Sequence, residues 1–129
     1  MDNVRLARSW LYLSGAILIA VGILGFFSNP LVGPEGLVAT DNPHNIVHIL
    51  TGLLALGLAY WMRDDVGTAT MLFGALYLVV FVVTVLSPTL FGVFSVAVNV
   101  IDHVIHIGLA IVSLALGYMA RGRSAVAAS

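Results

Sequence analysis

Two stretches, Asp41-Asn42-Pro43-His44-Asn45-Ile46-Val47-His48 and Asn99-Val100-Ile101-Asp102-His103-Val104-Ile105-His106, hold all four histidines of the chain. Each stretch opens a long apolar run. Proline at the first position of a helix, preceded by an aspartate or asparagine cap, is typical of a helix start. The first stretch has this pattern, so we expect polar side chains at the beginning of an apolar helix there, and the second stretch predicts the same for a later helix.

The composition indicates a protein whose solvent is lipid. Of the 129 residues, 60% are hydrophobic and 9% are charged, whereas a soluble domain is about 25% charged. A chain this apolar cannot cover its surface with polar side chains in water, and its length suits a single domain over residues 1–129. The absence of cysteine excludes a thiolate metal site, and the net charge of -1 gives no support to nucleic-acid binding.

The apolar runs predict an all-α integral membrane protein, a bundle of four helices. A hydrocarbon core of about 30 Å needs roughly 20 helical residues at about 1.5 Å each. Four runs approach or exceed this length, and the segment 28–42, which is rich in proline and glycine, reads as a loop between the first two. The expected helices cover residues 10–27, 43–62, 67–86 and 94–120.

The arginines predict the orientation of the bundle. With four spans both chain ends lie on one side, and all five arginines fall on that same side: Arg5, Arg8, Arg63, Arg121 and Arg123. Because positive residues stay on the cytoplasmic side, both termini are expected in the cytoplasm of a multi-pass protein of the plasma membrane. The lipid bilayer is then the main partner, and the histidine stretches face outward.

Helices two and four resemble each other when His48 is set against His106. At this offset polar positions meet polar positions and small residues meet small residues over about 20 residues, ending with Tyr60 opposite Tyr118. The pattern predicts two tandem helical hairpins related by a pseudo-twofold axis along the membrane normal. The alternative is that any two transmembrane helices share small residues and a tyrosine at the membrane border.

The polar residues of helices two and four share one face of each helix, because residues three or four apart lie on the same side. Ionisable groups at membrane depth turn inward, so the two faces should meet near the outer surface. Histidine pairs on facing helices can bind a metal in a bundle. The candidate metal ligands are His44, His48, Asp102, His103 and His106, with His48 and His106 at the centre and Asn45, Asn99 and Asp41 as orienting neighbours.

Several functions fit such a cluster. Imidazole and carboxylate ligands suit zinc, copper or iron, and a b-type haem held by His48 and His106 is a second possibility. The cluster also suits a hydrogen-bonded contact in an accessory subunit of a larger membrane complex, or in a homo-oligomer. A proton or small-solute path is weakened, because no ionisable residue lies in the inner half of any span. No catalytic residue is assigned, since no serine lies at a useful spacing from a base.

The two histidine stretches resemble a known family signature. The patterns Asn45-x-x-His48-x-x-x-Gly52 and Asp102-x-x-x-His106 are similar to those of an uncharacterised domain-of-unknown-function family of small four-helix membrane proteins from bacteria and archaea. The resemblance implies that these five residues matter and carries no established activity. More loosely, the architecture is similar to that of DoxX-like four-helix membrane subunits, which is an analogy of fold alone.

Overall fold

The computed structural model describes residues 2–92 and 95–127. Four helices carry the fold: α1 (Asn3–Leu24), α2 (Asn42–Trp61), α3 (Val66–Leu86) and α4 (Val100–Ala127). Each includes a segment long and apolar enough to cross a membrane, which agrees with the predicted all-α membrane bundle. The connections hold two short parallel strands, β1 (Val32–Gly33) and β2 (Val38–Ala39), and two 3₁₀ turns, η1 (Arg63–Asp65) and η2 (Leu90–Gly92).

Each helix begins where an aspartate or asparagine accepts a hydrogen bond from the backbone N–H three residues later. Asp2, Asp41 and Asp65 do so at the starts of α1, α2 and α3, over 2.8, 3.0 and 3.2 Å, and Asn99 does so for α4 over 3.0 Å. These caps satisfy N–H groups that have no partner within the helix. They also explain two differences from the expected bounds: α1 begins before residue 10, and α4 begins after residue 94, which lies outside the described residues.

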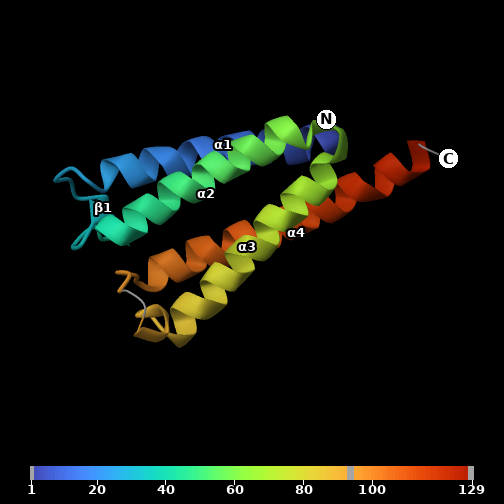
Figure 1. Ribbon diagram of the computed structural model, residues 1–129. Helices are drawn as coiled ribbons and strands as arrows, with labels where there is room; N and C mark the ends of the chain where they lie inside the picture. The colour runs from blue at the N-terminus through green and yellow to red at the C-terminus, as the bar shows by residue number, and fades with distance from the viewer. Residues whose placement is uncertain (1, 93–94, 128–129) are drawn as a thin grey trace.

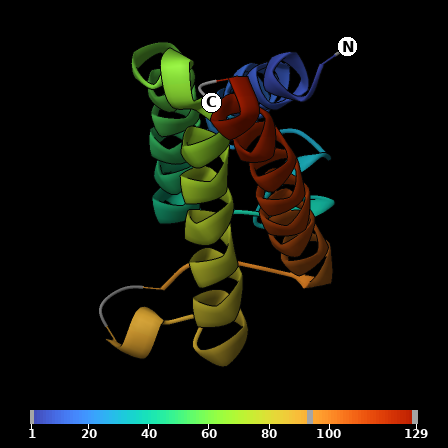
Figure 2. The same ribbon diagram turned by 90° about the vertical axis from the view of Figure 1, so that its right-hand side faces the viewer.

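The four helices form two pairs. Figure 1 shows α1 beside α2 and α3 beside α4, with the start of α1 and the end of α4 at one end of the bundle. Figure 2 shows α3 and α4 running side by side from the turned view. Leu11, Phe73 and Tyr77 are among the largest fully buried side chains, whereas many other leucine, isoleucine and valine side chains stay exposed. In a protein that crosses a bilayer, such exposed apolar side chains face lipid.

Glycines bring the paired helices into backbone contact. A Cβ atom added at Gly15 of α1 would lie 2.8 Å from the carbonyl oxygen of Gly52 of α2, and one added at Gly52 would lie 2.7 Å from the oxygen of Gly15. Gly67 of α3 and Gly117 of α4 contact each other in the same way, at 3.0 and 2.7 Å. Small residues at helix crossings allow this approach in lipid, where van der Waals packing drives association.

Candidate metal centre

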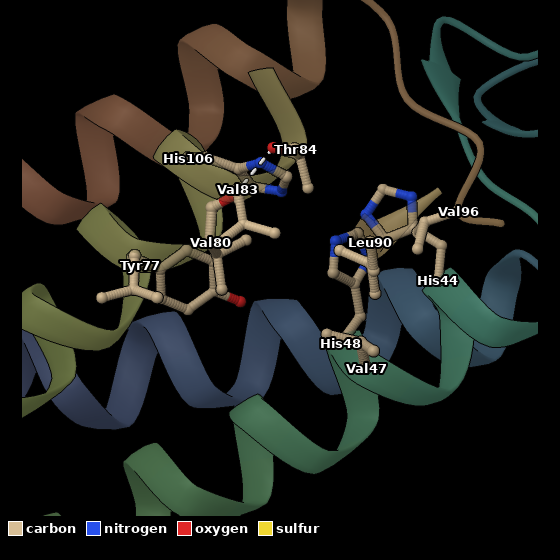
Figure 3. Close-up of a pocket in the computed structure, with 11 residues that line it drawn as sticks. His44, Val47, His48, Tyr77, Val80, Val83, Thr84, Leu90, Val96 and His106 are labelled. Atoms are coloured by element: carbon tan, nitrogen blue, oxygen red, sulfur yellow. Dashed lines mark hydrogen bonds between the residues drawn. The ribbon is translucent and has the colours of Figure 1, made fainter. Parts of the chain in front are cut away.

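Three of the four histidines come together at the end of the bundle where α2 and α4 begin. His44 and His48 lie one turn apart on α2, and His106 lies near the start of α4. Each offers one ring nitrogen, and these three atoms all lie within 4.8 Å of one another. The three side chains are buried, and Figure 3 shows their rings around one space beside Tyr77. This group, His44, His48 and His106, is called the three-histidine cluster below, and it could hold a metal ion.

The rings of the cluster form a compact triangle. The ring centre of His44 is 4.3 Å from that of His48 and 5.8 Å from that of His106. The centres of His48 and His106 are 6.4 Å apart. Because α2 and α4 belong to different helix pairs, the cluster exists only where the two pairs meet.

A backbone carbonyl fixes the orientation of His44. Its Nδ1 atom lies 2.6 Å from the carbonyl oxygen of Ala97. A carbonyl oxygen can only accept a hydrogen bond, so Nδ1 must carry the proton and Nε2 holds the free lone pair. A metal-binding histidine commonly has this arrangement, in which the second ring nitrogen donates to a carbonyl or carboxylate.

Asp41 holds the backbone of both residues in the contact between His44 and Ala97. One carboxylate oxygen accepts the backbone N–H of His44 at 3.0 Å, and the other accepts the backbone N–H of Ala97 at 2.9 Å. Both backbone groups of Ala97 are therefore held, the N–H by Asp41 and the carbonyl by the His44 ring. Asp41 was predicted as an orienting neighbour, and the structure places it where it holds both the start of α2 and the partner of His44.

Asp102 lies beside the three-histidine cluster and outside the group of atoms within 4.8 Å. Its Oδ2 atom accepts the backbone N–H groups of Asn99 at 2.8 Å and Ala39 at 3.2 Å. Its Oδ1 atom is buried and has no hydrogen-bond partner among the described residues. The side chain thus ties the loop before α2 to the start of α4, and the aspartate, predicted as a ligand, does not join the three rings.

His103 also lies outside the cluster. Its ring packs against Phe81 of α3, with ring centres 6.3 Å apart, although His106 is only three residues further along α4. The spacing of three residues predicted that both rings could point to one centre. The structure instead directs His103 to the neighbouring helix of its own pair and His106 across to α2.

The two predicted asparagines have different surroundings. Asn99 caps α4 and donates from Nδ2 to the carbonyl of Leu37 at 3.0 Å, a second link between the loop and α4. Asn45 is buried, and its amide has no hydrogen-bond partner among the described residues. A Cβ atom added at Gly25 would overlap with the Asn45 amide, so the missing side chain leaves the amide its space.

Two of the contacts at this site could not be predicted from the sequence. Ala97 acts through its backbone, so no pattern of side chains reveals it. Tyr77 of α3 is buried and forms a hydrogen bond of 2.7 Å with the Thr51 hydroxyl. The Thr51 hydroxyl itself donates to a backbone carbonyl of α2, so the Tyr77 hydroxyl donates to Thr51. The contacts of Ala97 and Tyr77 both depend on how the two helix pairs meet, which the internal repeat of the sequence does not specify.

An apolar cavity adjoins the cluster. It has a volume of about 190 Å³ and lies between α2 and α3, with the three histidines among its lining residues. Leu90 and Val96, from the segment between α3 and α4, also line it, as Figure 3 shows. Val79 on α3 lines it too and is 58% exposed. The cavity therefore reaches the apolar outer face of the bundle.

Contacts between the two helix pairs recur at an offset of 58 residues. The side chain of His44 bonds the backbone of Ala97, and the side chain of Asp102 bonds the backbone of Ala39. The cap bonds at the starts of α2 and α4 match at the same offset. These matches are consistent with the predicted pseudo-twofold repeat, and the duplication itself stays a prediction.

Comparisons of the chain with protein-family models, with curated proteins and with solved structures give no match. The resemblance carried by the two histidine stretches therefore stays a prediction, and the function is argued from the site alone.

Proposed function

We propose that this protein binds one transition-metal ion through His44, His48 and His106. The observation that supports the proposal is the meeting of three buried ring nitrogens within 4.8 Å, contributed by two different helix pairs. The hydrogen bond from His44 to Ala97 adds support, because it presents the Nε2 lone pair for ligation. Buried polar groups normally find hydrogen-bond partners, yet Nδ1 of His48 and of His106 has none among the described residues.

The spacing suits a small ion with an open coordination position. Zinc binds histidine nitrogen at about 2.0–2.1 Å, which puts two nitrogens of a tetrahedral site roughly 3.3 Å apart. The nitrogens of the cluster lie at most 4.8 Å apart, so side-chain rotations of up to about 1 Å close the site. Three histidines leave a fourth position for an exogenous ligand, as in catalytic zinc sites. Imidazole also suits copper and iron, so the ligands do not choose among the three metals.

A haem is a poorer occupant than a single ion. A macrocycle bound between His48 and His106 must occupy the plane between their rings. The His44 ring centre lies 4.3 Å from one and 5.8 Å from the other, which puts this ring inside the area of the macrocycle. Haem binding would require His44 to leave its bond with Ala97.

The direct test is the metal content of the purified protein in mild detergent. We expect about one equivalent of zinc, copper or iron in the natural chain, lost in the His48→Ala and His106→Ala variants. His103→Ala is the matched control for His106→Ala. His103 is on α4 like His106 but lies outside the cluster, so this variant should keep the metal. An equal loss in all three variants would mean that metal content only reports folding.

A folded, colourless and metal-free natural protein would refute the proposal. The three-histidine cluster would then be a packing contact, as expected of an accessory subunit of a larger membrane complex or of a homo-oligomer. Purification from native membranes with crosslinking would reveal such partner chains. A Soret band in the visible spectrum would instead make haem the occupant.

We also propose that the cluster lies near the outer face of the plasma membrane, with both termini in the cytoplasm. The proposal rests on the arginines. Four of them lie at the end of the bundle that holds the start of α1, the end of α2 and the last turns of α4: Arg5, Arg8, Arg63 and Arg121. The side chain of Arg123 is outside the described part of the chain. Since the chain has no cysteine, single cysteines can report sidedness. An impermeant maleimide should label Ser28→Cys in intact cells and Asp64→Cys only after lysis, and the reverse pattern would invert the topology.

A further inference from the structure

A second cavity lies between α1 and α4. Its volume is about 170 Å³, and His48 lines it as well as the first cavity. Its other lining residues are mostly apolar and include Ile17 and Ile105, which are 52% and 39% exposed. The cavity therefore reaches the face of the bundle that lipid would cover, on the side of the molecule formed by α1 and α4.

Three polar atoms from three helices are left without partners around this cavity. Ser14 of α1, His48 of α2 and Asp102 of α4 all line it and are all at least nine-tenths buried. Their Oγ, Nδ1 and Oδ1 atoms have no hydrogen-bond partner among the described residues. Buried polar groups without partners are costly, so such a set is expected to serve a bound group.

These atoms define the chemistry of the group they would bind. A carboxylate oxygen accepts a hydrogen bond, whereas a serine hydroxyl can donate or accept. A ligand hydroxyl can therefore donate to either of them. No arginine lines the cavity, so an anionic head group would have no counter-charge.

The size and walls of the cavity define the rest of the ligand. An apolar protein cavity of about 150 Å³ can bind benzene, so about 170 Å³ accommodates one aromatic ring. We propose that the cavity between α1 and α4 binds a neutral, lipid-soluble molecule with a hydroxyl head, a phenol or an alcohol, that enters from the bilayer. The hydroxyl donates to Ser14, and the apolar body lies against Trp10 and Leu109. This site needs no metal, so it does not depend on the function proposed above.

Trp10 provides a reporter inside the cavity. The chain has two tryptophans, and Trp61 is 81% exposed at the far end of α2. In a Trp61→Phe background all tryptophan fluorescence comes from Trp10, which lines the cavity. The probe is 4-bromophenol, whose bromine quenches tryptophan at short range, titrated into the purified full chain in detergent. Its matched control is 4-bromoanisole, which has the same ring and bromine but no hydroxyl proton.

We expect saturable quenching by 4-bromophenol, with affinity for 4-bromoanisole roughly 2- to 12-fold weaker, the value of one hydrogen bond. Ser14→Ala should weaken the phenol by a similar factor and leave the fold intact, because Ser14 Oγ makes no hydrogen bond to a described residue. Val21→Phe should fill the cavity and abolish saturation. Val79→Phe, in the other cavity, should change nothing.

Linear quenching that is equal for both probes and unchanged in Ser14→Ala and Val21→Phe would show simple partitioning into detergent and overturn the proposal. The same titration on protein stripped of metal separates the two proposals. Saturable quenching in metal-free protein supports this site even if the three-histidine cluster proves empty.

Discussion

The substitution Gly52→Ala tests how α1 and α2 are held together. The added methyl group would lie 2.7 Å from the carbonyl oxygen of Gly15 and 2.7 Å from Cγ1 of Ile19. Favourable contacts between carbon atoms lie at about 3.5–4.0 Å, so the helices must move apart by roughly 1 Å. Overpacking of this kind costs about 1–3 kcal/mol. The gain in helix propensity, at most about 1 kcal/mol, offsets only part of it.

Gly108→Ala is the matched control for this prediction. Gly108 lies within a span of α4, and a Cβ atom added there meets no atom within 4 Å. Its replacement should therefore stabilise the protein by about 0.5–1 kcal/mol, because alanine restricts the unfolded chain. The two variants thus shift the free energy of unfolding in opposite directions, by a difference of roughly 2 kcal/mol.

The assay is equilibrium unfolding in mixed micelles of a mild detergent and dodecyl sulfate, followed by far-ultraviolet circular dichroism. The midpoint should fall for Gly52→Ala and rise for Gly108→Ala, with unchanged slopes. Equal stability of the Gly52→Ala variant and the natural chain would refute the close backbone contact between α1 and α2. A loss of the same size in both variants would mean that alanine is unfavourable at any glycine of these helices, whatever its contacts.

Two further predictions concern hydrogen bonds at the start of α2 and between α2 and α3. Asp41→Ala should destabilise the protein by about 1–3 kcal/mol, since it removes a helix cap and the link to Ala97. Asp2→Ala removes an exposed cap and an exposed ion pair with Arg5 at 4.0 Å, and it should cost less in the same unfolding assay because exposed pairs contribute little. An equal cost would deny the link to Ala97 any weight. Tyr77→Phe should cost about 0.6 kcal/mol and at most about 1.7, the range for interhelical hydrogen bonds in membranes, and it should leave the metal content unchanged; loss of metal would bring Tyr77 into the site.

The candidate site was only partly predictable from the sequence. The shared face of His44 and His48 follows from their spacing of four residues on one helix, and the structure keeps them together. His103 and His106 have a spacing of three, which allowed the same inference, yet the structure separates them. Position along a helix limits the direction of a side chain, but the neighbouring helix decides which direction is occupied. For His103 the neighbouring helix is α3, where Phe81 packs against the histidine ring.

Asp102 illustrates the same limit for charged groups. It is the one carboxylate inside an apolar run of the sequence, which predicts either a metal ligand or a group that orients a histidine. In the structure its Oδ2 atom is taken by backbone N–H groups of Asn99 and Ala39. Ala39 lies 63 residues away along the chain, so no local pattern could reveal that its backbone N–H donates to one oxygen of this carboxylate.

The sequence by itself determined the class of this protein, its four long apolar helices and the cap at which α2 starts. Hydrophobic length and helix capping are local properties, and they act before any two helices meet. Tertiary structure alone decided which histidines form the cluster, where the cavities lie and that both backbone groups of Ala97 support His44. These features depend on the distance and angle between the two helix pairs, and hydrogen bonds between distant residues of the two pairs hold that geometry.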